Sequence, residues 1–139
     1  MESIKKKVLL NAPVDRVWKA LTNPKELATW MLAPTNFEPE IGRNFTFTGM
    51  ADENWDGIIR CKVKEMVKNK KLVFTWDSAL MKTETLVAIE LNAKGKQTEL
   101  TLVHSGWEKV PANAEMIRGH HDEGWDLRLN EKIKELVEA

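Results

Sequence analysis

Hydrophobic positions are spaced most regularly at the C-terminal end of the chain, between Glu115 and Val137. A stripe recurs there at steps of four, four, four, four and three residues: Ile117, His121, Trp125, Leu129, Ile133 and Leu136. This spacing places the side chains on one face of an amphipathic helix. Such a helix exceeds the usual length for a small domain, so the rest of the chain must wrap it to bury the stripe.

Local signals support this helix and raise one question about it. Asn113 is a residue type favoured as an N-cap, and Lys132 and Lys134 suit a helix C-terminus. Gly119 and Gly124 lie inside the predicted helix, where each is about 1 kcal/mol less favourable than alanine. These glycines are tolerable if something packs closely against the helix backbone at their positions.

The N-terminal third of the chain predicts one strand and two short helices. The strand covers Ile4–Leu10 and ends at Pro13, which suits the first turn of a helix. Pro24 opens the second helix, which ends near Trp30. The next segment, 32–42, contains Pro34, Pro39 and Gly42 with little periodicity, so we expect a surface loop there.

The middle of the chain changes to a period of two, which is typical of half-buried strands. Polar turns separate five such runs. Their inward positions are Phe45 and Phe47, then Ile59, Cys61 and Val63, then Leu72, Phe74 and Trp76, then Thr85, Val87, Ile89 and Leu91, and finally Leu100, Leu102 and His104. With the first strand, the sequence predicts an antiparallel sheet of about six strands with one buried face. Segregated strands and helices indicate the α+β class and a single domain, 1–139.

Composition narrows the possible partners. The chain has 21 basic and 21 acidic residues, so its charge does not favour binding to nucleic acid or to an anionic membrane. No apolar run is long enough to insert into a bilayer, and no signal-peptide pattern is present. Cys61 is the single cysteine, which excludes an internal disulfide and fits a reducing compartment. We therefore expect a soluble, cytoplasmic protein, either a monomer or a weak dimer.

The aromatic composition is unusual, with six tryptophans and no tyrosine. The tryptophans are spread along the chain rather than clustered. They either form an ordinary aromatic core or line a cavity, because an indole offers a flat apolar wall and one N–H donor.

Several short motifs resemble those of a known family. They are Ala12-Pro13-Val14, the run from Val17 to Thr22, Trp30, the run from Val63 to Glu65, the run from Leu72 to Trp76, the run from Thr98 to Leu102, the run from His104 to Trp107, and Gly124-Trp125. The chain resembles, from end to end, the START and Bet v 1-like superfamily, in its branch related to the activator of the heat-shock protein 90 ATPase. The resemblance implies a helix-grip fold, in which a curved antiparallel sheet wraps a long C-terminal helix. It also implies an apolar cavity between sheet and helix, where relatives bind lipids, sterols, polyketides or plant phenolics.

The residue patterns offer little for metal binding or catalysis. His120 and His121 are neighbours on a helix and diverge by about 100°, so they cannot chelate one ion together. No His-x-x-x-His or paired-cysteine spacing exists. Ser105 follows His104, but neighbours on a strand face opposite sides of the sheet. We therefore predict no metal, no cofactor and no catalytic residue, and consider a binding protein a better interpretation than an enzyme.

Three polar residues share the inward parity of their apolar neighbours, namely His104, Glu65 and His121. Burying such a group without a partner costs about 1–3 kcal/mol. Each is either satisfied by backbone, water or another of the three, or it orients a ligand inside the cavity.

The sequence therefore predicts one mainly apolar pocket lined by aromatic and histidine side chains from separate elements. The predicted lining is Trp30, Phe47, Trp76, His104, Trp107, His121 and Trp125, with the two histidines as polar contacts. Trp30 and Trp107 are placed at the cavity mouth. The leading hypothesis is a binding module for a lipid-like or flat aromatic small molecule. The alternatives are a protein-interaction module with a chaperone partner, and an enzyme that uses the same cavity.

Overall fold

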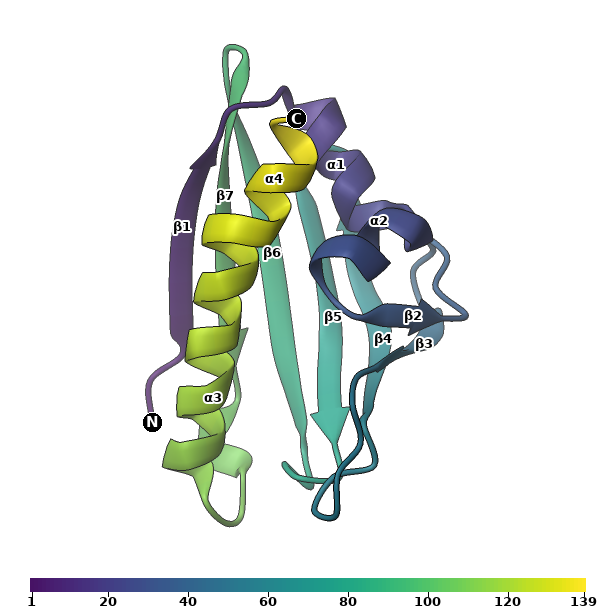
Figure 1. The fold of residues 1–139 in the computed structure, drawn as a ribbon, viewed down its shortest axis with the longest axis vertical. Helices are drawn as coiled ribbons and strands as arrows, with labels where there is room; N and C mark the ends of the chain where they lie inside the picture. The colour runs from purple at the N-terminus through teal and green to yellow at the C-terminus, as the bar shows by residue number, and fades with distance from the viewer.

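The structure, a computed structural model, describes residues 1–139 and has the α+β architecture that the sequence predicts. Figure 1 shows a curved antiparallel sheet with the C-terminal helix lying across its concave face. Two short helices, α1 (Val14–Thr22) and α2 (Pro24–Trp30), cover the end of the sheet near the C-terminus of the chain. The end opposite α1 is built from the loop after residue 48, the turn after residue 78 and the start of the C-terminal helical segment.

The sheet has seven strands in the order β1-β7-β6-β5-β4-β3-β2, and every neighbouring pair is antiparallel. The strands are β1 (Ile4–Leu10), β2 (Ala33–Thr35), β3 (Asn44–Thr48), β4 (Ile58–Val67), β5 (Lys71–Ser78), β6 (Glu84–Lys94) and β7 (Gln97–Ser105). The seventh strand is β2, which lies in the segment that we expected to be loop. Pro34 lacks an N–H, and β2 is accordingly a short strand at the edge of the sheet.

The helices α1 (Val14–Thr22) and α2 (Pro24–Trp30) follow β1 as predicted. Asn23 separates them because its side-chain oxygen accepts hydrogen bonds from the backbone N–H groups of Lys25 and Glu26. Pro24 occupies the first position of α2, where a missing N–H has no cost. The two helices thus turn sharply and close one end of the sheet.

The C-terminal helical segment runs from Ala114 to Val137 in three parts: α3 (Ala114–Leu127), a π-helical segment η2 (Arg128–Lys132) and α4 (Ile133–Val137). A step of four residues exceeds the 3.6 residues of an α-helical turn, so a straight α-helix would rotate the predicted stripe away from the sheet. The wider π turn takes up part of this drift.

Two details of the predicted helix differ from the structure. Val137, rather than Leu136, is the last fully buried position of the stripe, and Leu136 is half-buried. Asn113 occupies the N-cap position, but its side chain makes no capping hydrogen bond because its backbone is left-handed, with φ of 59°. The short 3-10 helix η1 (Trp107–Lys109) leads into this segment.

The prediction that Glu65 faces inward is wrong. The register between β4 and β5 shifts between Val63 and Glu65, which marks a β-bulge. A bulge adds one residue to a strand and reverses the parity of the positions beyond it. Glu65 is consequently exposed and pairs with Lys71 of the neighbouring strand at 3.2 Å.

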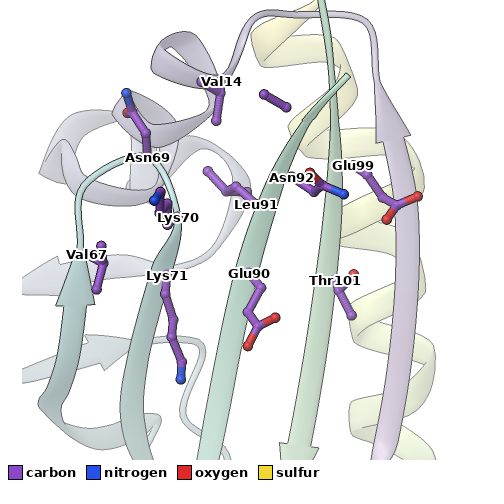
Figure 2. A pocket seen from close by; sticks show the side chains of 11 residues that line it. Val14, Val67, Asn69, Lys70, Lys71, Glu90, Leu91, Asn92, Glu99 and Thr101 are labelled. Carbon is purple, nitrogen blue, oxygen red and sulfur yellow. The ribbon is translucent and has the colours of Figure 1, made fainter. Parts of the chain in front are cut away.

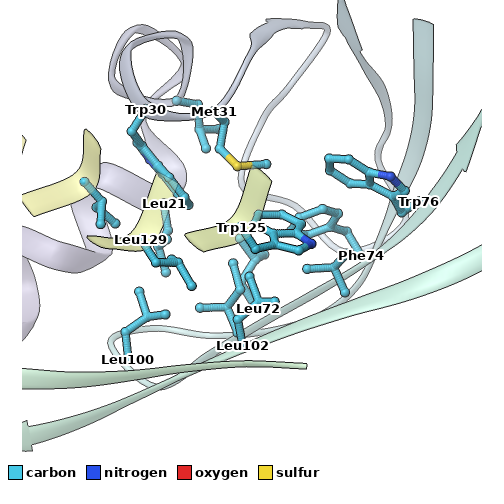
Figure 3. Close-up of a cluster of buried hydrophobic side chains, with 14 of the residues drawn as sticks. Leu21, Trp30, Met31, Leu72, Phe74, Trp76, Leu100, Leu102, Trp125 and Leu129 are labelled. Carbon is cyan, nitrogen blue, oxygen red and sulfur yellow. The ribbon is translucent and has the colours of Figure 1, made fainter. Parts of the chain in front are cut away.

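The core is a single cluster of 33 buried residues between the sheet and the helices. In Figure 3, Trp125 and Leu129 of the C-terminal segment face Leu100 and Leu102 of β7. Lys6 is an exception on the inward face of β1, between Ile4 and Val8. Its ammonium group pairs with Asp122 at 2.7 Å and with Asp126 at 2.9 Å, which ties β1 to α3.

No helix is long and apolar enough to cross a membrane.

Leu129→Ala is expected to lower the free energy of unfolding by about 2–5 kcal/mol, because it leaves a cavity where the helix meets the sheet. Leu129 is 1% exposed and is the buried residue of the π segment. Urea unfolding followed by circular dichroism measures the change. A loss below about 0.5 kcal/mol, the range of ordinary surface substitutions, would contradict this placement in the core.

Candidate functional site

Six of the seven predicted site residues form one continuous group of rings, which we call the ring cluster. Its members are Phe47 (β3), Trp76 (β5), His104 (β7), Trp107 (η1), and His121 and Trp125 (α3). Ring centroids lie 5.4 Å apart for Trp76 and Trp125 and 4.6 Å apart for His104 and Trp107. The edge-to-face and tilted geometries are those that aromatic pairs favour. Strand parity and the helix stripe together bring these rings to one place.

His104 is fully buried, and both of its ring nitrogens have partners. The indole N–H of Trp125 donates to Nδ1 at 3.1 Å, so Nδ1 carries no proton. Nε2 must then carry the proton and donate to the Thr85 hydroxyl, 2.8 Å away. The Thr85 hydroxyl in turn donates to the backbone carbonyl of Trp76 at 2.7 Å. The network assigns His104 one neutral tautomer.

His121 is satisfied in the opposite tautomer. The indole N–H of Trp76 donates to its Nε2 at 3.1 Å, so the proton resides on Nδ1. Nδ1 donates to the backbone carbonyl of Ile117, one turn earlier in α3, at 2.8 Å. Neither histidine therefore has a free ring nitrogen with which to act as a general base or to contact a ligand while these bonds hold.

Burial keeps both histidines neutral. Desolvation, with a smaller contribution from His121, lowers the pKa of His104 from 6.5 to about 2. Desolvation also lowers the pKa of His121. The hydrogen bond to Ile117 opposes that shift, and the positive charge of Arg128 adds to it.

Trp30 is separate from the ring cluster. Trp30 is the last residue of α2 and is fully buried. Its indole N–H donates to the carbonyl of Ala20 at 2.8 Å. Figure 3 shows it beside Met31. Trp107 is likewise fully buried, with its indole N–H donated to the carbonyl of His104 at 2.9 Å. The structure thus places neither residue at a cavity mouth, because each sits in a well-packed junction between elements.

A cavity of about 450 Å³ opens beside the ring cluster, at the end of the sheet opposite α1. We call it the rim cavity. It is lined by Leu32, Gly49, Met50, Asp52, Trp55, Ile59, Trp76, Ser78, Leu80, His120, His121, Gly124 and Arg128. Six of these thirteen residues are hydrophobic, and the volume lies within the range of small-molecule sites. Trp76 and His121 are the two predicted site residues on its wall. Phe47, His104, Trp107 and Trp125 lie behind the wall in the ring cluster, and Trp30 lies apart from it.

The rim cavity also contains residues that the sequence patterns did not select. Arg128 lies outside the hydrophobic stripe, and Trp55 lies in a segment predicted as a plain turn. The Arg128 guanidinium lies 5.7 Å from the ring centroid of Trp125, and a side chain at Gly124 would meet it at 2.8 Å. Because Gly124 has no side chain, the Arg128 guanidinium can pack against the helix backbone one turn before its own position. A glycine four residues before an arginine is therefore the sequence signal that could have indicated Arg128.

The largest hollow of the surface, about 800 Å³, lies elsewhere, where the β4–β5 turn meets β6 and β7 (Figure 2). Only four of its eleven lining residues are hydrophobic. Its walls carry lysine and glutamate side chains, including Lys71, Glu90 and Glu99. Charges of both signs in an open polar hollow give no basis for a selective ligand, so the rim cavity is the better candidate.

No group of three or more histidine, cysteine, aspartate or glutamate side chains lies close enough to hold a metal ion. Cys61 is buried on the inward face of β4. Desolvation, together with the charge of Asp77, raises the pKa of its thiol well above the usual range, so the nucleophilic thiolate form is disfavoured.

Comparisons with solved structures agree with this architecture. The Mesorhizobium loti protein MLL2253 matches with a TM-score of 0.84 at 24% identity, over 98% of this chain and 96% of that one. The Bacillus halodurans protein BH1534 matches with a TM-score of 0.79 at 30% identity, over 99% and 97%. A dimer of Aha1 from Colwellia psychrerythraea matches with a TM-score of 0.75 at 18% identity, over 99% and 96%. A comparison with curated protein sequences gives no match.

The long helix held by a curved antiparallel sheet defines a helix-grip fold, as the sequence motifs predicted. The chain belongs to the family described as Activator of Hsp90 ATPase homolog 1-like protein, whose profile matches residues 11–138.

Proposed function

We propose that this protein binds a small apolar molecule, lipid-like or flat and aromatic, in the rim cavity. The observation that carries the proposal is the cavity itself, about 450 Å³ in volume and bounded by indole and aliphatic side chains. Binding sites of this kind are concave and mostly apolar, with a few polar groups that orient the ligand. Affinity in the micromolar range, about −8 kcal/mol, is expected for a pocket with few polar contacts.

The ring cluster contributes to this proposal as the rigid support of the cavity wall. Trp76 and His121 reach the wall, and their mutual hydrogen bond fixes both rings. Phe47, His104, Trp107 and Trp125 pack behind them, whereas Trp30 lies outside the ring cluster. We expected the two histidines to contact the ligand directly, but their nitrogens already have partners. The expected contacts are therefore the face of Trp76 and the aliphatic side chains.

Titration with flavonoids, chalcones and fatty acids, followed by tryptophan fluorescence and chemical-shift mapping, tests the proposal. Saturable binding with shifts at the rim cavity is the expected result. Leu80→Asp, on the cavity wall and 41% exposed, should weaken binding, because it brings a charge into an apolar wall. Leu127→Asp, 47% exposed and not on that wall, is the matched control. Failure of all three compound classes to bind would exclude the proposal.

A second candidate function is binding of another protein, such as a chaperone. Large hydrophobic side chains are exposed around the rim cavity, with Met50 90% and Met116 57% exposed. Exposed apolar groups at one end of a molecule suit a protein interface. The family description names an activator of the Hsp90 ATPase. Pull-down with heat-shock protein 90 and a rise in its ATP turnover would favour this function over small-molecule binding.

A further inference from the structure

Arg128 presents an uncompensated cation to the rim cavity. Its guanidinium makes no salt bridge and no hydrogen bond to a protein group, and burial alone accounts for the lowering of its pKa. An arginine nevertheless stays charged at neutral pH. Taking a guanidinium partly out of water without an anion is unfavourable, and proteins normally pair such groups.

The structure holds this cation in a defined place. The ring of Trp125 lies 5.7 Å from the guanidinium carbon, within the range of a cation–π contact. On the other side, Gly124 leaves a bare stretch of helix backbone against which the guanidinium rests. Trp125 is itself fixed by its hydrogen bond to His104, so the ring cluster positions the cation.

Trp55 contributes its ring, and not its donor, to the cavity wall. Its indole Nε1 has no hydrogen-bond partner but is fully buried, so a ligand in the cavity does not reach it. Arg128 is therefore the donor of this wall that lacks an acceptor and lies within reach of a ligand.

The other ionisable groups of the wall do not supply that acceptor. Asp52 is exposed, and its Oδ1 accepts the backbone N–H groups of Asn54 at 2.7 Å and Trp55 at 2.9 Å. His121 is neutral with both nitrogens occupied, and His120 points to the exposed side of the helix. Arg128 is therefore the one fixed cation of the wall.

We propose that the rim cavity selects apolar molecules that carry a carboxylate, with the Arg128 guanidinium donating to its oxygens. The inference rests on the proposed function and adds the ligand's chemical class to it. Arginine suits the role because its planar fork matches the two oxygens of a carboxylate. The aliphatic and indole walls receive the apolar part, which can be an aromatic system or an acyl chain.

Paired acids and esters test the inference. We would titrate 2-naphthoate and its methyl ester, and dodecanoate and its methyl ester, by calorimetry with the wild type and with Arg128→Gln. The acids are expected to bind at least tenfold more tightly than their esters. Arg128→Gln should weaken acid binding much more than ester binding and so remove this preference. The two pairs show whether the aromatic or the acyl form fits better.

Glycine variants provide a control for folding. Gly119→Ala and Gly124→Ala both replace a glycine within α3, and alanine is more favourable than glycine in a helix interior. No atom lies within 4 Å of a side chain at Gly119, whereas one at Gly124 displaces the guanidinium of Arg128. Both variants should keep the fold, and only Gly124→Ala should weaken acid binding.

The possible results separate the two proposals. Equal affinity for acids and esters, or an acid preference that survives Arg128→Gln, would overturn the carboxylate inference and leave the proposed function intact. Absence of binding by all four compounds would overturn the inference. If flavonoids and chalcones still bind, the proposed function stands without it.

Discussion

Trp125→Ala is expected to lower the free energy of unfolding by about 3–5 kcal/mol, a large fraction of the 5–15 kcal/mol that stabilises a typical domain. Trp125 is 1% exposed at the centre of the ring cluster. Its removal leaves a cavity between sheet and helix, which the surrounding rings are too rigid to fill. It also leaves Nδ1 of His104 without its donor. Urea unfolding at neutral pH measures the loss.

Trp125→Phe separates the two contributions. Phenylalanine keeps most of the ring volume but cannot donate to His104, so the remaining loss reports chiefly the missing hydrogen bond. We expect about 1–3 kcal/mol for this variant. If Trp125→Ala and Trp125→Phe both cost less than about 1 kcal/mol, the ring cluster would not be the tightly packed unit that the structure shows.

Mild acid is expected to destabilise the protein through His104. The folded state holds its pKa near 2, whereas the unfolded chain has an ordinary value of 6.5. Above pH 6.5 both states are neutral, so the full stability is present. Below pH 6.5 the unfolded state alone takes up the proton, and stability falls by about 1.4 kcal/mol per pH unit. Between pH 6.5 and 4.5 the loss is about 2.5 kcal/mol, and His121, whose pKa is also lowered, acts in the same direction.

Two measurements isolate this effect from that of the carboxylates. Proton NMR of the His104 ring should show no titration of the folded protein down to pH 4.5. His104→Gln, which cannot take up a proton, should have a shallower dependence of unfolding free energy on pH across the same interval. A His104 titration with a midpoint above pH 5 in the folded state would contradict the assigned network.

The fold was predictable because its main signals are periodic. Alternation fixed the inward positions of the strands, including Phe47, Trp76 and His104, and spacing along the helix fixed His121 and Trp125. These five rings converge because a curved antiparallel sheet brings its inward positions toward one helix face. The two glycines in the predicted helix raised the question of what packs against the backbone there. At Gly124 it is the Arg128 side chain, whereas no atom lies within 4 Å of a side chain placed at Gly119.

Features that depend on local register or on long side chains were not predictable in the same way. A bulge between Val63 and Glu65 reverses the parity of Glu65, and the alternation of apolar and polar residues does not indicate it. Arg128 lies outside the stripe and reaches the rim cavity through four rotatable bonds, so periodicity assigns it to the solvent. Trp55 sits in a turn that is closed by hydrogen bonds to Asp52, and the alternation of residue types gives no direction for its ring. The bulge and the positions of the Arg128 and Trp55 side chains are therefore evident only from the three-dimensional structure.

The inward-facing Lys6 has a consequence for how copies of this chain behave during refolding at high concentration. β1 is one edge of the sheet, and its outer backbone groups form a template onto which a strand of another molecule could add. Lys5 and Lys7 place charges on one side of that edge, while Lys6 is held on the other side by Asp122 and Asp126. A strand added there would have to pack against charged groups on both faces. The edge is thereby protected against strand-mediated aggregation, and the Lys6 ion pairs also keep α3 in place over it.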